Sequence, residues 1–213
     1  MKDLIFLVDF DRTITLNDST DELMNQFNPQ LVEEYQGKFR RGELRVREYI
    51  KGLLESLKLT KEDYEKAVSK NLQIDPDFKK FIELGYEMRV VSAGTYENIL
   101  PNFQKEGIDI PLEHIYSNKL TFREDNIEIS FPYDNEDSDE GICKKTILLK
   151  YKQKYKKVFF IGDGYSDIGA ASKADFVFAK RGRYLEKYCL EKGIDVFVYD
   201  TFHDIIEYVK KNV

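Results

Sequence analysis

The sequence has few of the features that several classes of protein require. Cys143 and Cys189 are its only cysteines, and they are too few and too far apart to predict a disulfide framework or a zinc site. We therefore expect a reduced, cytoplasmic setting. Basic residues are not in excess, because the net charge of the 213 residues is -6, and this argues against a nucleic-acid partner.

Long apolar runs and internal repeats are missing as well. Residues 4–8 are continuously apolar, but a run of this length is too short to span a bilayer. The run ends at acidic residues and has no small-residue cleavage site, so it does not resemble a signal peptide. The sequence therefore predicts no contact with a membrane.

Alternating apolar and amphipathic segments predict an α/β fold. The run at residues 4–8 is typical of a strand buried on both faces of a parallel sheet. Further strands are predicted at 88–91, 158–161, 176–178 and 196–199, with helices at 77–84, 96–106 and 143–155. Residues 119–131 alternate around Asp125 and Asn126, which predicts a hairpin with its turn there. Strands and helices in this order indicate a core with a parallel sheet.

A block of helices interrupts this alternation after the first strand. Residues 18–71 contain no convincing strand. Two helix-start signatures occur there, Ser19 with Glu22 and Thr60 with Asp63. Apolar residues recur between them at helical spacing, at Ile50, Leu53, Leu54 and Leu57. We therefore predict a helical insertion in the α/β core.

Acidic residues directly follow the first predicted strand. Asp9 and Asp11 lie two positions apart, and two carboxylates beside a buried strand are costly without compensation. A magnesium ion bound by carboxylate and carbonyl oxygens would relieve their repulsion. One carboxylate would then attack phosphorus while the other handles the proton of the leaving group. The alternative interpretation is a loop start or a helix cap.

Two further segments place polar groups at the end of a strand or the start of a helix. Ser92, Ala93 and Gly94 end the second predicted strand, where small residues let backbone N–H groups approach a phosphate. The alternative there is an ordinary turn. Lys144 lies at the start of a predicted helix and offers a compact positive charge to phosphate oxygens. The alternative is a solvated surface lysine, like its neighbour Lys145.

The last polar cluster, Gly162–Asp167, follows the strand at 158–161. Asp163 would complete the metal site, and Asp167 would cap the next helix or orient Lys144 and the metal waters. The alternative is a plain turn followed by a helix cap. Because ligands bind beyond the carboxyl ends of the strands in such sheets, the clusters together predict one site. The acids, the hydroxyl group and the lysine follow one another on successive strands and helices with their polar ends on the same edge, and the needs of folding alone do not easily explain this.

These residues form a pattern that covers essentially the whole chain: Asp9, Asp11, Thr13, Ser92, Lys144, Gly162, Asp163, Gly164 and Asp167. With this pattern the chain resembles the haloacid dehalogenase-like hydrolase superfamily, and within it the phosphoserine-phosphatase-like branch. The resemblance implies a Rossmann-like α/β core at residues 1–15 and 75–213. It also implies a helical cap domain at residues 16–74.

The resemblance further implies a role for each residue. Asp9 would be the nucleophile of a phosphoric monoester hydrolase, and Asp11 its general acid and base. The implied cofactor is Mg²⁺, held by the side chains of Asp9 and Asp163 and by the backbone carbonyl of Asp11. The implied phosphate-binding residues are Thr13, Ser92, Ala93, Gly94 and Lys144, with Asp167 supporting the site.

Within this branch the chain is most similar to the phosphatases of methionine salvage, which act on 2-hydroxy-3-keto-5-methylthiopentenyl-1-phosphate. The acidic opening motif and the Cys143-Lys144 pair support this, whereas Arg12 and the acidic loop at residues 134–140 depart from the pattern. Phosphoserine phosphatases are the nearest alternative. Their cap holds the serine zwitterion with a glutamate and an arginine, where this chain has Asp18 and Lys51. Asp18 has a second interpretation as a helix cap.

The expected partner is a small phosphate ester, bound by a monomer or a homodimer. A phosphotransferase or mutase stays open as an alternative, because an aspartyl phosphate can pass to an acceptor other than water. A signalling receiver domain also phosphorylates an aspartate on an α/β core, but such domains are shorter and lack a helical block at this place. A carbon–halogen hydrolase shares the nucleophile and needs neither magnesium nor Asp11.

Overall fold

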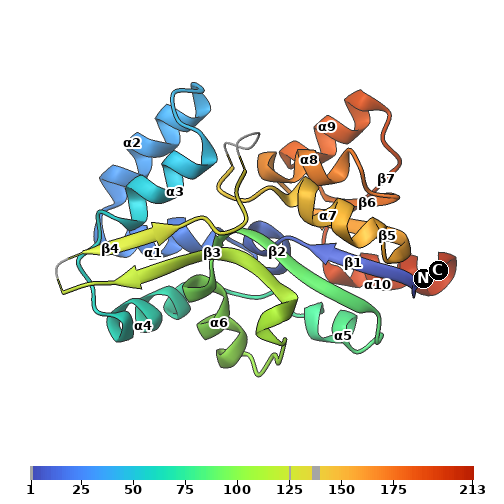
Figure 1. The fold of residues 1–213 in the computed structure, drawn as a ribbon, viewed down its shortest axis with the longest axis horizontal. Coiled ribbons are helices and arrows are strands. Elements are labelled where there is room, and N and C mark those ends of the chain that lie inside the picture. Colours follow the sequence, from blue (N-terminus) through green and yellow to red (C-terminus); the bar gives the residue numbers. More distant parts are fainter. Residues whose placement is uncertain (1, 125, 136–139) are drawn as a thin grey trace. The chain divides into compact units, whose positions relative to one another are not determined.

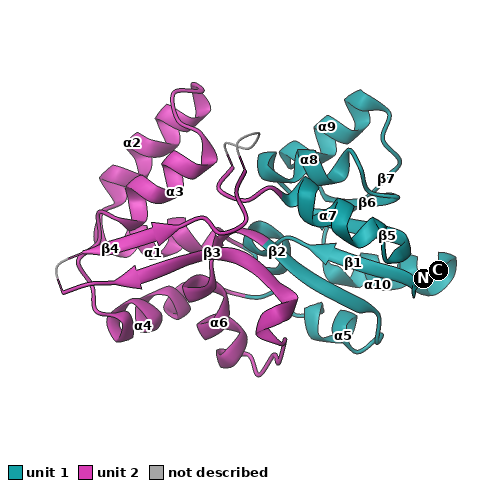
Figure 2. Cartoon of the chain, viewed as in Figure 1, with its two compact units in different colours: residues 1–16, 74–91, 144–213 teal, residues 17–73, 92–143 magenta. Residues whose placement is uncertain are grey.

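The computed structural model of the chain describes residues 2–124, 126–135 and 140–213 (Figure 1). The chain divides into two compact units (Figure 2). Unit 1 contains residues 1–16, 74–91 and 144–213, and unit 2 contains residues 17–73 and 92–143. Each unit is therefore built from segments that lie far apart in the sequence.

Unit 1 contains parallel strands that begin near the N-terminus. β1 (Lys2–Val8) pairs on one side with β2 (Glu87–Thr95) and on the other with β5 (Tyr155–Gly162). β6 (Phe176–Lys180) and β7 (Val196–Tyr199) continue the sheet in the same direction. All the strands predicted for the core are therefore present, with small differences at their ends.

Helices of unit 1 pack against this part of the sheet or against one another (Figure 1). They are α5 (Phe78–Ile82), α7 (Lys144–Lys152), α8 (Ile168–Ala171), α9 (Tyr184–Lys192) and α10 (Phe202–Asn212), with the short turns η1 (Phe10–Ile14) and η3 (Tyr165–Asp167). The last four residues of β1 are 0% exposed, as predicted for a strand covered on both faces. The ring of Phe6 lies at the centre of this core, 5.2 Å from that of Phe81 and 5.5 Å from that of Phe159.

Unit 2 combines helices with an antiparallel hairpin. Its helices are α1 (Ser19–Phe27), α2 (Pro29–Arg40), α3 (Val46–Leu54), α4 (Lys61–Asn71) and α6 (Tyr96–Lys105), with a short turn η2 (Leu112–His114). β3 (Ile115–Phe122) and β4 (Ile127–Ser130) form the hairpin predicted at residues 119–131. Two parts of the predictions, Asp125 of the turn and residues 136–139 of the acidic loop, lie outside the described residues.

A buried amide joins three of the helices of unit 2. Asn98 Nδ2 donates to Ser19 Oγ at 2.8 Å and to Thr20 Oγ1 at 3.2 Å. Asn98 Oδ1 accepts from the hydroxyl groups of Tyr64 at 2.5 Å and Thr95 at 3.1 Å. Because this amide is 0% exposed and fully hydrogen-bonded, it ties α1, α4 and α6 together.

The hydrogen-bonded order of the strands is β4-β3-β2-β1-β5-β6-β7. The pairs from β2 through β7 are parallel, which confirms the predicted α/β class with a Rossmann-like sheet. Unit 2 holds nearly all of the predicted cap at residues 16–74, but it also holds residues 92–143. The division into core and cap therefore stays a prediction. In the described part of the chain, no helix has the length and apolar character needed to cross a membrane.

Candidate functional site

The carboxyl ends of β1 and β5 lie side by side in unit 1. Val8 pairs with Ile161 in the parallel register, and the backbone N–H of Asp9 donates to the Ile161 carbonyl oxygen at 2.9 Å. Asp163 leaves β5 two residues after Ile161. The structure thus brings two of the predicted acids together at one edge of the sheet.

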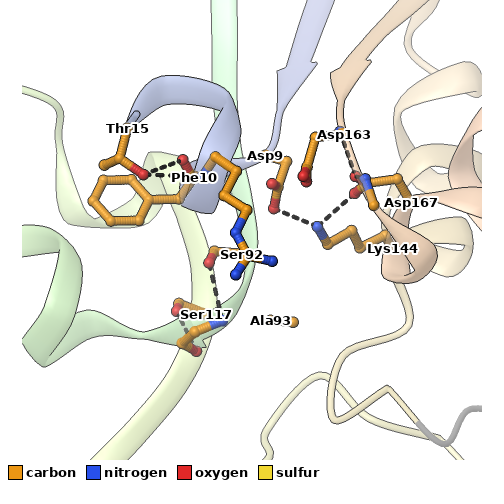
Figure 3. A network of polar contacts seen from close by, with 12 residues as sticks. Asp9, Phe10, Thr15, Ser92, Ala93, Ser117, Lys144, Asp163 and Asp167 are labelled. Atoms are coloured by element: carbon orange, nitrogen blue, oxygen red, sulfur yellow. Dashed lines mark hydrogen bonds and ion pairs between the residues drawn. The ribbon is translucent and has the colours of Figure 1, made fainter. Parts of the chain in front are cut away.

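Lys144 places a buried positive charge at this edge (Figure 3). It is the first residue of α7 and is only 1% exposed. Its Nζ donates to Asp9 Oδ1 at 2.5 Å and to Asp167 Oδ1 at 2.7 Å. The next residue, Lys145, is exposed, because consecutive residues of a helix face different directions. Only the first of the two lysines contacts the acids.

Asp167 holds this arrangement in place. Its Oδ2 accepts the backbone N–H groups of Asp163 and Gly164, both at 2.9 Å, while its Oδ1 accepts from Lys144. Gly162 leaves the space that this carboxylate needs, since a Cβ at that position would lie 2.5 Å from Asp167 Oδ2. Both oxygens of Asp167 are bound by groups of the protein, which suits a residue that orients Lys144.

Burial and like charge shift the pKa values of these acids. Burial raises the pKa of Asp9 to about 7, although the attraction of Lys144 acts in the opposite direction. Burial, with the charges of Asp9 and Asp167, raises the pKa of Asp163 well above its usual range. Burial also lowers the pKa of Lys144, but the charges of Asp167 and Asp9 raise it more. Lys144 is therefore positively charged, and it is shared between the carboxyl groups of Asp9 and Asp167.

The same acids form a candidate cation site. One carboxylate oxygen each from Asp9, Asp163 and Asp167 lie within 4.8 Å of one another. Because Asp167 already uses both oxygens within the protein, Asp9 and Asp163 are the side chains better suited to hold an ion. Carboxylate oxygen ligands fit the predicted Mg²⁺. The predicted contribution of the Asp11 carbonyl stays a prediction.

Asp11 and Thr13 lie in the turn η1, which follows the first acid. Arg12 between them has φ 60, a left-handed conformation that costs a non-glycine residue about 1–2 kcal/mol. The backbone N–H of Arg12 donates to Thr15 Oγ1 at 3.0 Å, and Thr15 Oγ1 donates to the Phe10 carbonyl oxygen at 3.2 Å. Asp11 is half-buried and Thr13 is buried. Strained backbone held by such bonds is typical of functional sites.

Ser92, Ala93 and Gly94 lie in unit 2, near the end of β2. The strand continues through them to Thr95, further than the predicted end at Val91. All three residues are buried, and the backbone N–H of Gly94 donates to Ser92 Oγ at 3.0 Å. Their part in phosphate binding stays a prediction.

The two predicted residues of the helical block have different surroundings. Asp18 is the N-cap of α1, and its Oδ1 accepts the backbone N–H groups of Thr20 and Asp21, both at 3.1 Å. This is the helix-cap role that the sequence offers as its second interpretation. Lys51 lies in α3 and is exposed. A contact of either residue with substrate stays a prediction.

Arg183 belongs to this site but does not emerge from the sequence. Its Nε lies 3.5 Å from Asp163 Oδ2, and its charge acts to lower the pKa of Asp163 against the stronger effect of burial. Arg183 precedes α9 and follows β6 by three residues. Its place after a predicted strand was the available signal, but one arginine in a charged loop has no distinctive pattern.

Comparisons with known proteins identify the family. Residues 4–202 match the family model described as Putative Phosphatase. A 2-hydroxy-3-keto-5-methylthiopentenyl-1-phosphate phosphatase of Bacillus mycoides (strain KBAB4) is 30% identical over 210 residues, which cover 95% of this chain and 94% of that relative. The bifunctional enzyme MtnB/MtnX of Bacillus licheniformis is 31% identical over 213 residues, which cover 96% of this chain and 49% of that relative. The chain thus spans about half the length of the bifunctional relative.

A solved structure has the same fold as this chain. The phospho-aspartyl intermediate analogue of a phosphoserine phosphatase superimposes with a TM-score of 0.71 at 22% identity, covering 98% of this chain and 99% of that one. At this identity the likeness shows the fold alone. The match over residues 4–202 shows that the chain belongs to the putative phosphatase family.

Proposed function

We propose that this phosphatase hydrolyses a small-molecule phosphate monoester and that Asp9 carries the phosphoryl group transiently. The observation on which the proposal rests is the buried contact between Asp9 and Lys144 at the tip of β1. A carboxylate beside a fixed cation suits attack on phosphorus, because the negative charge of the phosphoryl oxygens has to be neutralised for the nucleophile to approach.

The proposed reaction has two steps. First, a carboxylate oxygen of Asp9 forms a bond to phosphorus while the bond between phosphorus and the ester oxygen breaks, and Asp11 gives a proton to the departing oxygen. Second, Asp11 takes a proton from water as the water oxygen attacks phosphorus. The bond between phosphorus and Asp9 then breaks, which releases inorganic phosphate and restores the carboxylate.

The charges around Asp9 prepare it for this role. Burial favours the protonated acid, and the positive charge of Lys144 beside it favours the anion, so that the pKa of Asp9 is raised to about 7. The anion that attacks phosphorus therefore depends on Lys144. Mg²⁺, held by the side chains of Asp9 and Asp163 and by the backbone carbonyl of Asp11, would supply further positive charge for the phosphoryl oxygens. Lys144 and Ser92 would bind the phosphate, together with the backbone at Ala93 and Gly94 and with Thr13.

The proposed substrate is 2-hydroxy-3-keto-5-methylthiopentenyl-1-phosphate, an intermediate of methionine salvage. The relative of that name, which matches along nearly its whole length, supports this choice. Residues 16–74 would form a cap domain that reads the organic part of the substrate, with Asp18 and Lys51 in contact with it. Phosphoserine is the alternative substrate, and phosphoryl transfer to an acceptor other than water is the alternative reaction. We also propose a cytoplasmic monomer or homodimer that binds neither nucleic acid nor membrane.

Release of phosphate from a generic aryl phosphate in the presence of magnesium tests the chemistry. We expect Asp9→Asn to abolish release, because the amide is not a nucleophile for phosphorus. Asp3→Asn is the matched control, since Asp3 is an exposed aspartate in β1, the strand that Asp9 follows, and it should keep the parent rate. After an acid quench, the parent should carry one phosphoryl group on the peptide that contains Asp9. Robust metal-independent release by Asp9→Asn would refute the proposal.

A panel of small phosphate esters tests the substrate. We expect the highest kcat/KM for the methionine-salvage ester, and a higher value for phosphoserine would favour the alternative substrate. Repeating the assay with an alcohol acceptor distinguishes hydrolysis from transfer, because transfer produces a new phosphate ester in place of inorganic phosphate.

A further inference from the structure

Two side chains of β3, Ser117 and Asn118, hold the segment Ser92–Gly94 within unit 2. Figure 3 shows Ser117 beside this segment. Asn118 Nδ2 donates to the Ala93 carbonyl oxygen at 2.7 Å. Ser117 Oγ donates to the Gly94 carbonyl oxygen at 2.9 Å. Ser117 and Asn118 are both 0% exposed, so water does not compete for these bonds. Two successive carbonyl groups of the segment are therefore fixed from the side of β3.

The bond from Asn118 sets the direction of a whole peptide unit. The carbonyl group of Ala93 and the N–H of Gly94 belong to one planar trans peptide, so they point in opposite directions. With the carbonyl held toward Asn118, the N–H of Gly94 points the other way. There it donates to Ser92 Oγ at 3.0 Å.

This bond leaves the hydroxyl hydrogen of Ser92 available for donation. Its Oγ accepts the N–H of Gly94 and keeps its own hydrogen for a second partner. Within the described part of the chain, no group accepts a hydrogen bond from this hydroxyl. Because hydrogen bonds to anionic oxygens are stronger than those to neutral ones, a hydroxyl oriented in this way suits a phosphate oxygen.

The surroundings of Asn118 argue against a purely stabilising role. Its Oδ1 is buried and has no hydrogen-bond partner among residues 2–124, 126–135 and 140–213. A buried acceptor without a partner lowers stability, and an apolar side chain of similar shape would avoid that cost. The amide is therefore better explained by the donor that it directs at Ala93.

We propose that Asn118 and Ser117 are positioning residues for phosphate binding, because they fix the peptide units that orient the Ser92 hydroxyl. This inference rests on the proposed function, in which Ser92 binds the phosphate group of the substrate. Neither residue touches the phosphate itself. Their effect should therefore appear in the affinity for phosphate.

Inorganic phosphate, used as a competitive inhibitor, is the probe. We expect Asn118→Ala to raise its inhibition constant about tenfold, equivalent to about 1.4 kcal/mol, and to raise KM more than it changes kcat, since the lost interaction is made with bound substrate as well as in the transition state. Ser117→Ala should raise the constant about threefold. Ser117→Thr keeps the hydroxyl donor and should stay within about twofold of the parent.

Asn102→Ala is the matched control. Asn102 is also buried in unit 2, and its Nδ2 donates to the Asn98 carbonyl oxygen inside α6 at 2.8 Å. Truncating it removes a bond of the same kind without touching the segment that contains Ser92. It should lower the melting temperature and leave the inhibition constant of phosphate unchanged.

The possible outcomes separate this inference from the proposed function. An unchanged inhibition constant in Asn118→Ala, or an equal rise in Asn102→Ala, would overturn the inference while the parent activity stands. If Asn118→Ala does not fold, the Ser117 variants decide, and equal constants for Ser117→Ala and Ser117→Thr would overturn it. A parent protein that neither hydrolyses phosphate esters nor binds phosphate would overturn the proposed function, and this inference with it.

Discussion

Replacing Lys144 with methionine tests the buried charges most directly. Lys144→Met keeps an unbranched side chain but removes two hydrogen bonds, at 2.5 Å to Asp9 and 2.7 Å to Asp167. Hydrogen bonds to charged groups contribute about 1.5–3 kcal/mol each, and removing one partner of a buried ion pair costs about 3–5 kcal/mol. We therefore expect the free energy of unfolding at neutral pH to fall by about 3–5 kcal/mol and phosphate release to be lost.

Urea denaturation with divalent cations chelated measures this loss, because a bound cation would compensate part of it. Lys145→Met is the matched control, since Lys145 is the exposed neighbour of Lys144. It should change stability by less than about 0.5 kcal/mol. The loss in Lys144→Met corresponds to a fall in melting temperature of about 10 °C for a chain of this size. Equal stability of the two variants would refute the buried ion pairs.

A double variant separates charge from packing. In Lys144→Met the carboxylates of Asp9 and Asp167 face each other without a cation. Adding Asp167→Asn removes one of these charges, so Lys144→Met/Asp167→Asn should be more stable than Lys144→Met alone. If the losses of the two single variants simply add, the two side chains do not interact in the folded protein, and the electrostatic account fails.

Three further predictions concern neighbouring features. Gly162→Ala should lower the unfolding free energy by about 1–3 kcal/mol, because its Cβ would lie 2.5 Å from Asp167 Oδ2. Gly164→Ala is the control, since a Cβ there would meet nothing within 4 Å. Equal losses of stability in the two variants would contradict the steric argument. Arg183→Gln removes a cation beside the proposed metal site, so the magnesium concentration that half-saturates thermal stabilisation should fall about two- to fivefold, and a rise would oppose this reasoning. The backbone N–H groups of Asp200 and Thr201, just before α10, hold the pKa of Asp204 below its usual value, so Asp204→Ala should cost about 1 kcal/mol at neutral pH. A carboxyl group with a lowered pKa stabilises the folded protein at pH values above its pKa in the unfolded chain, and this effect is lost on acidification. The difference in unfolding free energy between the parent and Asp204→Ala should therefore shrink below about pH 4. A constant difference down to pH 2 would contradict this prediction.

The strands of unit 1 could be predicted because parallel buried strands are short apolar runs. Residues 4–8 identify β1, although the strand begins at Lys2, where exposed polar residues carry no such signal. The helix predicted at 77–84 is shorter, and Gly85 follows it with φ 77, a conformation that favours glycine. Ser92–Gly94 looks like a turn in sequence but continues β2, because small polar residues are compatible with both.

The acids of the site could be predicted because they directly follow apolar runs. Their cationic partners could not, because they come from distant segments of the chain. Asp9 and Asp163 both follow a strand end, so the parallel sheet brings them to one edge. Nothing local distinguishes Lys144 from Lys145, and only the family resemblance implies Lys144 as the phosphate-binding residue. Arg183 lies 20 positions from its partner Asp163, and no spacing rule links the two.

The charges at the tip of β1 explain why burial, a lysine and a cation site occur together. Burial excludes water from the acids, which strengthens every interaction there but also favours the protonated form of Asp9. The positive charge of Lys144 opposes this effect, but Lys144 donates hydrogen bonds to both Asp9 and Asp167, so the two acids share its charge. The charge of Asp163 is opposed by Arg183, whose side chain is 41% exposed and therefore screened by solvent. A divalent cation between Asp9 and Asp163 would favour the ionised form of both acids. The metal requirement that we propose would therefore have the same cause, burial, as the dependence of Asp9 on its lysine.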